Sequence, residues 1–187
     1  GKLLTMDESD HIFDPGLVLV RGDKIAYAGE LVDVPAGYER LDAPTLWAHP
    51  GLVDLHTHIH CHGWDDLNDV VKPLNPELRA RPTIDPTEPA LAHARAAGVT
   101  TLFGIPGSGS SNGGFGTLYK PERDVGYEEV VLRDPGGMKI AQNFNPQRGA
   151  GDVGNSWCGL AFNLEYLNDR AARLAAAGRE IGRASCR

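Results

Sequence analysis

A strand, a helix and a second strand follow one another between residues 52 and 105, and this order constrains the fold more than any other feature of the chain. Leu52 to Ile59 is an apolar run that predicts a strand. The residues VTTLFGI at 99–105 are rich in β-branched side chains and predict a second, buried strand. Strands that are joined through a helix pair in parallel, so we expect β/α units around a parallel sheet.

The helix between these strands has start and stop signals. Asp85 followed by Glu88 resembles a capping box, Pro86 suits the first helical position, and Gly98 can end the helix in a left-handed conformation. Near the end of the chain, the apolar spacing of NLEYLNDRAARLAAAGRE at 163–180 predicts another helix that stops at Gly178.

The first forty residues favour β structure. Two short runs, Leu17–Val20 and Lys24–Ala28, alternate in polarity around an Arg-Gly-Asp turn, which is typical of a hairpin. Proline and glycine then punctuate the chain as far as Pro50. We therefore predict two domains, a β domain at 1–49 and a β/α domain at 50–187.

Charge and cysteine content exclude several classes of partner. The net charge of −7 disfavours nucleic acid and anionic membranes, and no apolar run is long enough to span a bilayer. Three cysteines without a C-x-x-C pair argue against a disulfide framework. We expect a cytoplasmic location, although secretion or a periplasmic location stays open because the chain opens without an initiator Met.

Four histidines gather at 56–62, at the C-terminal end of the first predicted strand of the β/α domain and just beyond it. Side chains alternate along a strand, so Val53, Leu55, Thr57 and Ile59 are expected on one face and Asp54, His56 and His58 on the other. Two imidazoles on one face, about 7 Å apart by the strand rise, can converge on one ion. His56 and His58 therefore predict a divalent metal site, for which Zn²⁺ is the favoured ion.

Other residues near this strand leave alternatives open. His60 and His62 belong either to a substrate-binding loop or to a solvated loop. The glycine-rich segment Gly107–Gly116 could cradle a nucleotide or phosphate, but that motif needs a helix directly after it. The histidines could also form a non-enzymatic metal-binding tract.

Two segments carry a resemblance to a known family. HPGLVDLHTH at 49–58, followed by AGVTTLFGIPGS at 97–108, resembles the amidohydrolase superfamily. PGSGSSNGGFGTLYK and GGMKIAQNFNP are similar to the imidazolonepropionase-like and dipeptidase-like members. The resemblance implies an α/β fold: the first half of a (β/α)8 TIM-like barrel, preceded by a small β-sandwich segment.

The resemblance also implies a chemistry. It predicts hydrolysis of carbon–nitrogen bonds in amides, cyclic amides or peptides by a metal-activated water, with one or two ions. His56 and His58 match the first two ligands, and Lys139 is the expected carboxylated bridge, with Lys120 as the alternative. Gly107, Ser108 and Gly109 would flank a small-molecule substrate.

The family pattern is incomplete within this sequence. Its later histidines and its catalytic aspartate should follow Lys139, yet no histidine follows His93. We expect an N-terminal part of a longer enzyme that is inactive alone and that can form a homo-oligomer when whole.

Overall fold

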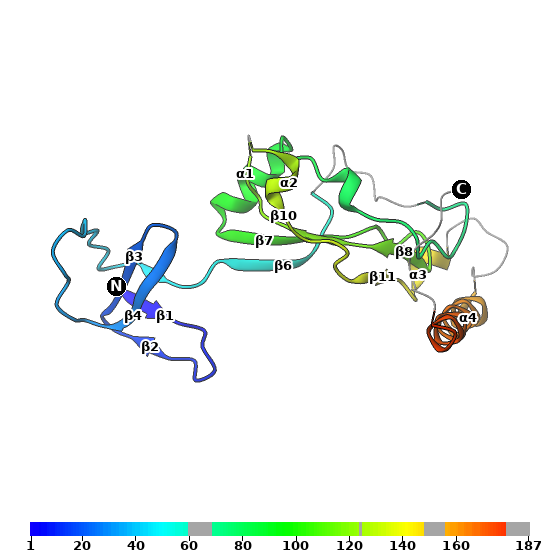
Figure 1. Ribbon diagram of the computed structural model, residues 1–187, viewed down its shortest axis with the longest axis horizontal. Coiled ribbons are helices and arrows are strands. Elements are labelled where there is room, and N and C mark those ends of the chain that lie inside the picture. The colour runs from blue at the N-terminus through cyan, green and yellow to red at the C-terminus, as the bar shows by residue number, and fades with distance from the viewer. Residues whose placement is uncertain (60–68, 124, 148–155, 179–187) are drawn as a thin grey trace. The chain divides into compact units, whose positions relative to one another are not determined.

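The computed structural model describes residues 1–59, 69–123, 125–147 and 156–178. The chain divides into two compact units, Gly1–Gly51 and Leu52–Arg187. Each unit is described by itself below, with its elements as labelled in Figure 1.

The first unit consists of five short strands. Their bounds are β1 Lys2–Leu4, β2 Ile12–Phe13, β3 Gly16–Arg21, β4 Lys24–Glu30 and β5 Trp47–Ala48. Strand β1 pairs antiparallel with β2 and parallel with β5, while β3 and β4 form a separate antiparallel hairpin. The hairpin turns at Gly22, as the alternating sequence predicts. The β-sandwich expected at 1–49 stays a prediction, because the described strands form two separate small sheets.

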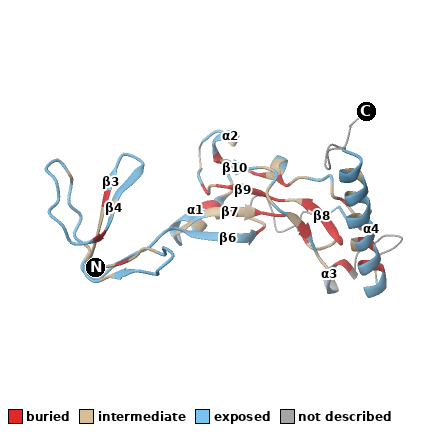
Figure 2. Ribbon diagram, turned by 60° about the horizontal axis from the view of Figure 1, so that its bottom comes forward, coloured by how far each residue is buried: buried red, intermediate tan, exposed pale blue. Residues whose placement is uncertain are grey.

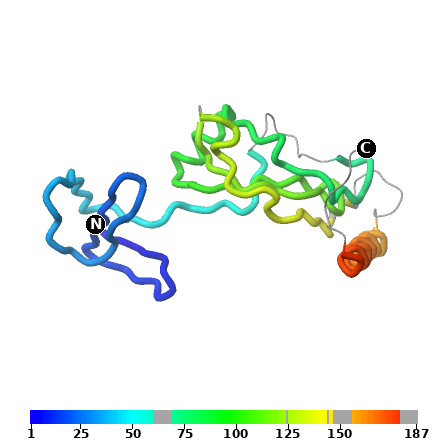
Figure 3. The backbone as a smooth tube through the Cα atoms, in the orientation of Figure 1, coloured from blue at the N-terminus to red at the C-terminus, as the bar shows by residue number. Residues whose placement is uncertain are grey.

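The second unit is built around a mixed sheet with the strand order β10-β9-β7-β6. The sheet comprises β6 Leu52–Thr57, β7 Val99–Gly104, β9 Thr117–Tyr119 and β10 Val131–Arg133, and helix α1 Pro89–Ala96 lies between β6 and β7 in the sequence. Strands β6 and β7 pair in parallel and run side by side in the backbone trace (Figure 3), which confirms the predicted strand–helix–strand unit. Strands β9 and β10 join antiparallel, so within the described residues this sheet has one parallel pair. The half barrel expected for the second unit stays a prediction, since these strands form one mixed sheet in the described residues.

A second ladder contains the glycine-rich segment. Strand β8 Asn112–Phe115 pairs antiparallel with β11 Met138–Ile140. The segment 73–80 contacts the other side of β8 at two isolated bridges, where the Asn112 N–H donates to the Pro73 carbonyl (3.0 Å) and the Ala80 N–H donates to the Phe115 carbonyl (2.8 Å). The remaining elements are η1 Arg81–Thr83, α2 Tyr127–Val130, α3 Phe144–Gln147 and α4 Trp157–Ala176.

The hydrophobic core of the second unit lies between α1 and the sheet. It consists of five buried residues, namely Ile84, Leu91, Leu102, Tyr119 and Val130. Leu91 comes from the helix, and Leu102 and Tyr119 come from paired positions on β7 and β9. Burial of these side chains stabilises the parallel unit, since each removes apolar area from water.

Helix α1 begins later than the sequence pattern predicts. Its N-cap is Glu88, whose Oε1 accepts from the Ala90 N–H (3.1 Å), and Pro89 occupies the first helical position. The Asp85 carboxylate instead accepts from the N–H (2.8 Å) and hydroxyl (2.7 Å) of Thr87 in a tight turn. The predicted capping box from Asp85, with Pro86 as the first helical residue, is therefore wrong.

Both predicted helix stops are found. Gly98 has φ +85° and its N–H donates to the Arg95 carbonyl (2.9 Å), which closes α1 in the left-handed conformation expected of glycine. Gly178 has φ +67° just beyond α4. Helix α4 starts earlier than its apolar pattern indicates, because Ser156 Oγ accepts from the Gly159 N–H (3.1 Å) and caps it. Within the described ranges no helix is long and apolar enough to cross a membrane.

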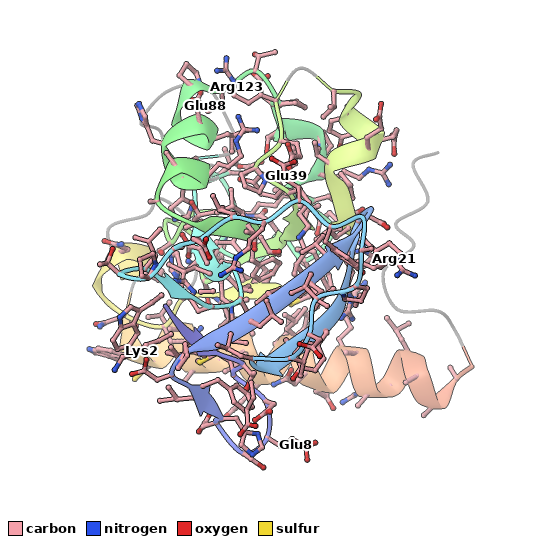
Figure 4. All side chains as sticks on the ribbon, turned by 90° about the vertical axis from the view of Figure 1, so that its left-hand side faces the viewer. Lys2, Glu8, Arg21, Glu39, Glu88 and Arg123 are labelled. Carbon is pink, nitrogen blue, oxygen red and sulfur yellow. The ribbon has the colours of Figure 1, made fainter. Side chains whose placement is uncertain are left out.

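Two residues of the segment 121–123, which follows β9, form contacts near the start and near the end of α1. Near the helix start, Arg123 donates to the Thr87 carbonyl (3.5 Å), and Glu88 and Arg123 lie at the same end of the helix in Figure 4. On the helix itself, Arg95 forms an ion pair with Glu122 (3.2 Å). These contacts link α1 to the segment that follows β9.

Candidate functional site

Strand β6 positions the two predicted histidine ligands at its C-terminal end. The rings of His56 and His58 lie 5.4 Å apart, centroid to centroid, and are nearly perpendicular (88°). Alternation along the strand brings these side chains to the same face, as the sequence predicts. The structure therefore brings the two imidazoles together.

The opposite face of β6 is largely exposed. Val53 and Leu55 lie on this face and are 55% and 65% exposed. Figure 2 shows β6 as an exposed strand at the edge of the sheet. Only Thr57 of this set of strand residues is buried, because it lies where β6 meets the segment after β7.

The end of β6 is held by the residue that follows β7. The Ile105 N–H donates to the Thr57 carbonyl (3.1 Å), which extends the parallel ladder past Gly104. The Nδ1 of His58 lies 3.0 Å from the Ile105 carbonyl oxygen. His56 is anchored through its main chain, because its N–H donates to Asp54 Oδ1 (2.9 Å). Sequence reasoning missed Ile105, because a main-chain carbonyl leaves no signature in a sequence.

The glycine-rich segment does not form a phosphate cradle. Gly107 is buried, Ser108 and Gly109 are partly buried, and the chain then enters strand β8. The main-chain groups of Asn112 pair with Pro73 and Asn75, and its side-chain oxygen accepts from the Gly114 N–H (3.1 Å). Since strands and no helix directly follow this segment, the nucleotide-binding alternative is wrong.

Lys139 lies on β11, in the β8–β11 ladder that contains part of the glycine-rich segment. It pairs with Gly114 across β8 and β11 and is 9% exposed, so a surface lysine is excluded. A methyl group placed on Gly113 would lie 3.6 Å from Cγ of Lys139 and 3.0 Å from Cβ of Pro106. Gly113 therefore lies next to both Lys139 and Pro106, the residue after Ile105. Strand β11, which carries Lys139, pairs with β8 and is not part of the β6–β7 sheet.

The alternative lysine occupies a different position. Lys120 directly follows β9, and its Nζ donates to Thr101 Oγ1 on β7 (3.1 Å). Its N–H also donates to the Val130 carbonyl (2.8 Å). Lys120 is therefore held on the mixed sheet, whereas Lys139 lies on the β8–β11 ladder.

Among the described residues, the predicted metal donors are a pair of histidines, His56 and His58. His60 and His62 lie outside the described residues. Across the described ranges, no group of three or more His, Cys, Asp and Glu side chains could hold a metal ion. His56 and His58 have the chemistry of zinc ligands, and this chain supplies them as two adjacent imidazoles.

Comparisons with known proteins relate the chain to hydrolases. No known protein-family model matches it. An imidazolonepropionase of Paenarthrobacter aurescens (strain TC1) is 34% identical over 59 residues, covering 32% of this chain and 14% of the relative. A dihydroorotase of Anaeromyxobacter dehalogenans (strain 2CP-C) is 28% identical over 128 residues, covering 57% of this chain and 30% of the relative.

One solved structure resembles most of the chain. An amidohydrolase from Thermotoga maritima MSB8 matches with a TM-score of 0.65 and 27% identity, covering 88% of this chain and 46% of that chain. The chain thus spans less than a third of these two curated relatives and less than half of the solved structure.

Proposed function

The chain belongs to the amidohydrolase superfamily, and from this premise we propose that it is the metal-binding part of a hydrolase that cleaves carbon–nitrogen bonds. The relatives are named as an imidazolonepropionase, a dihydroorotase and an amidohydrolase. The proposed substrates are small amides, cyclic amides or peptides. The observation that carries the proposal is the histidine pair at the end of a strand in a parallel β/α unit.

The residues present fit a divalent metal ion. His56 and His58 would hold it, because two imidazoles 5.4 Å apart by ring centroid can turn toward one ion. Zn²⁺ is the proposed metal, since it favours nitrogen donors. When bound, such an ion lowers the pKa of water and polarises a carbonyl group.

The protein's own residues supply orientation around this pair. The hydrogen bond between Thr57 and Ile105 holds the end of β6 against β7. It therefore orients the backbone that carries the two histidine rings. Lys139 is the proposed carboxylated lysine of a two-metal site, because it is buried and lies beside the Ile105–Gly107 segment. Gly107, Ser108 and Gly109 are the proposed wall of the substrate site, and His60 and His62 are proposed to belong to the same loop region.

Replacing both histidines tests the proposal. The His56→Ala/His58→Ala protein should lose bound Zn²⁺, measured by mass spectrometry of the metal after dialysis. His93→Ala is the matched control, because His93 is an exposed histidine on α1. Unchanged metal content in a folded double variant would reject the proposed site.

A second pair of variants distinguishes the lysines. Lys139→Ala should lose amide hydrolysis in the complete enzyme and regain part of it with added short carboxylic acids, which replace a lost carbamate. Lys120→Ala should keep its activity without such additives. The reverse pattern would assign the bridge to Lys120.

A further inference from the structure

The main-chain carbonyl of Ile105 contacts the His58 ring at a single nitrogen. The Nδ1–oxygen distance is 3.0 Å, and the contact is partly buried. A carbonyl oxygen only accepts hydrogen bonds, so this geometry requires the proton on Nδ1. In the neutral ring Nε2 then carries the lone pair.

The same residue also fixes the backbone beside that ring. The Ile105 N–H donates to the Thr57 carbonyl (3.1 Å), and the Ile105 side chain is 5% exposed. One residue of the segment after β7 therefore holds both the peptide before His58 and the ring of His58. For His56, the hydrogen bond to Asp54 Oδ1 orients the peptide and leaves the ring angle to other contacts.

We infer that Ile105 is a positioning residue, which selects the Nδ1–H tautomer of His58 through its main-chain carbonyl and presents Nε2 as the donor atom. The tautomer follows from the hydrogen bond alone; its use in metal binding rests on the proposed function. Groups that orient a ligating histidine commonly change metal affinity by about 10- to 100-fold.

The tautomer can be measured without any metal. In ¹⁵N-labelled, metal-free protein, two-bond ¹⁵N–¹H correlations report which ring nitrogen is protonated. His58 should show a protonated Nδ1 and an unprotonated Nε2. A protonated Nε2, or equal population of both tautomers, would overturn the inference even if the protein binds Zn²⁺.

Two amide substitutions separate positioning from metal binding. His58→Asn keeps an N–H donor near the Nδ1 position, whereas His58→Gln places its amide near the Nε2 position. We expect the Asn variant to melt at a higher temperature than the Gln and Ala variants, because it can keep the bond to Ile105. Equal melting temperatures of all three folded variants would overturn the inference.

Zinc binding distinguishes this inference from the proposed function. His58→Asn should bind Zn²⁺ at least about tenfold more weakly than the parent protein, since it lacks Nε2. If the tautomer and the melting temperatures agree with expectation but the parent protein binds no Zn²⁺, the positioning role of Ile105 stands and the proposed metal site fails. His93→Asn, on the exposed face of α1, is the control for both readouts.

Discussion

Both units of this protein contain several strands, but they differ in how well the apolar side chains of those strands are buried. In Gly1–Gly51 the buried apolar side chains are Leu3 and Leu19, while Ile25 is 70% exposed and Leu41 is 90% exposed. In the second unit a helix covers the sheet, and Leu91 and Leu102 are each 1% exposed. Local pairing is enough to make a hairpin, but a core needs a second layer of secondary structure.

The size of the first unit is consistent with this difference. Domains of fewer than about 60 residues bury too little surface to be more than marginally stable. The exposed apolar residues of the first unit therefore offer area that further strands could cover. The second unit already has the layers that an independent core requires.

The largest expected effect comes from the core of the second unit. Leu91→Ala should lower the free energy of unfolding by about 2–5 kcal/mol, because it leaves a cavity between α1 and the sheet. Leu41→Ala, the same change at an exposed site in the first unit, should stay within about 0.5 kcal/mol. Urea unfolding followed by far-UV circular dichroism measures both. Equal losses would mean that the two units share one core.

An intermediate effect is expected at the exposed edge of the sheet. Strand β6 presents Leu52, Val53 and Leu55 to solvent at a sheet edge, which favours association of the 187-residue chain. Leu55→Lys should weaken self-association about tenfold or more, since burying a leucine contributes about 1.5–3 kcal/mol. Sedimentation velocity over a concentration series measures this shift. Leu41→Lys is the control, and a monomeric parent protein would contradict the prediction.

The smallest effect is expected at a surface ion pair of the first unit. Asp7 Oδ2 lies 2.8 Å from His11 Nδ1, and this hydrogen bond, with the N–H groups of His11 and Ser9, holds the pKa of Asp7 well below its usual value of about 3.9. A depressed carboxyl pKa stabilises the fold above the unfolded value, and this contribution is lost as the pH falls through the folded value.

The Asp7 pair is exposed, so its contribution to stability is small. Asp7→Asn should lower stability slightly above about pH 4, where the ionised carboxylate contributes, and should flatten the fall in stability below that pH. Melting temperatures from pH 2 to pH 7 test this expectation. A steeper acid limb in the variant would give the opposite sign and reject it.

Local signals in the sequence were enough to predict several elements. The hairpin β3–β4 follows from alternation around Gly22, and the end of α1 follows from Gly98. The start of α1 was misplaced because Asp85 and Glu88 are both plausible caps. Pro89 decides between them, since proline fits the first turn of a helix and disrupts later turns.

These local signals could not predict which strands, distant in the sequence, pair with each other. Nothing in the local sequence says that β9 pairs antiparallel with β7, or that β11 pairs with β8 and leaves the main sheet. The half barrel follows from the family resemblance and not from local signals, and it stays a prediction. At the site, strand alternation predicted the facing of His56 and His58, but the acceptor for His58 came from a main-chain atom 47 residues away.

That separation has a consequence for how the site assembles during synthesis. Closing a loop of 47 residues costs only about (3/2)RT ln n plus a constant, and helix α1 shortens the flexible path further. Strands β6 and β7 can pair as soon as β7 has left the ribosome, before β8, β11 and Lys139 have emerged from it. His58 would then meet its acceptor early, and the order of translation would place the histidine pair ahead of every later contribution to the site.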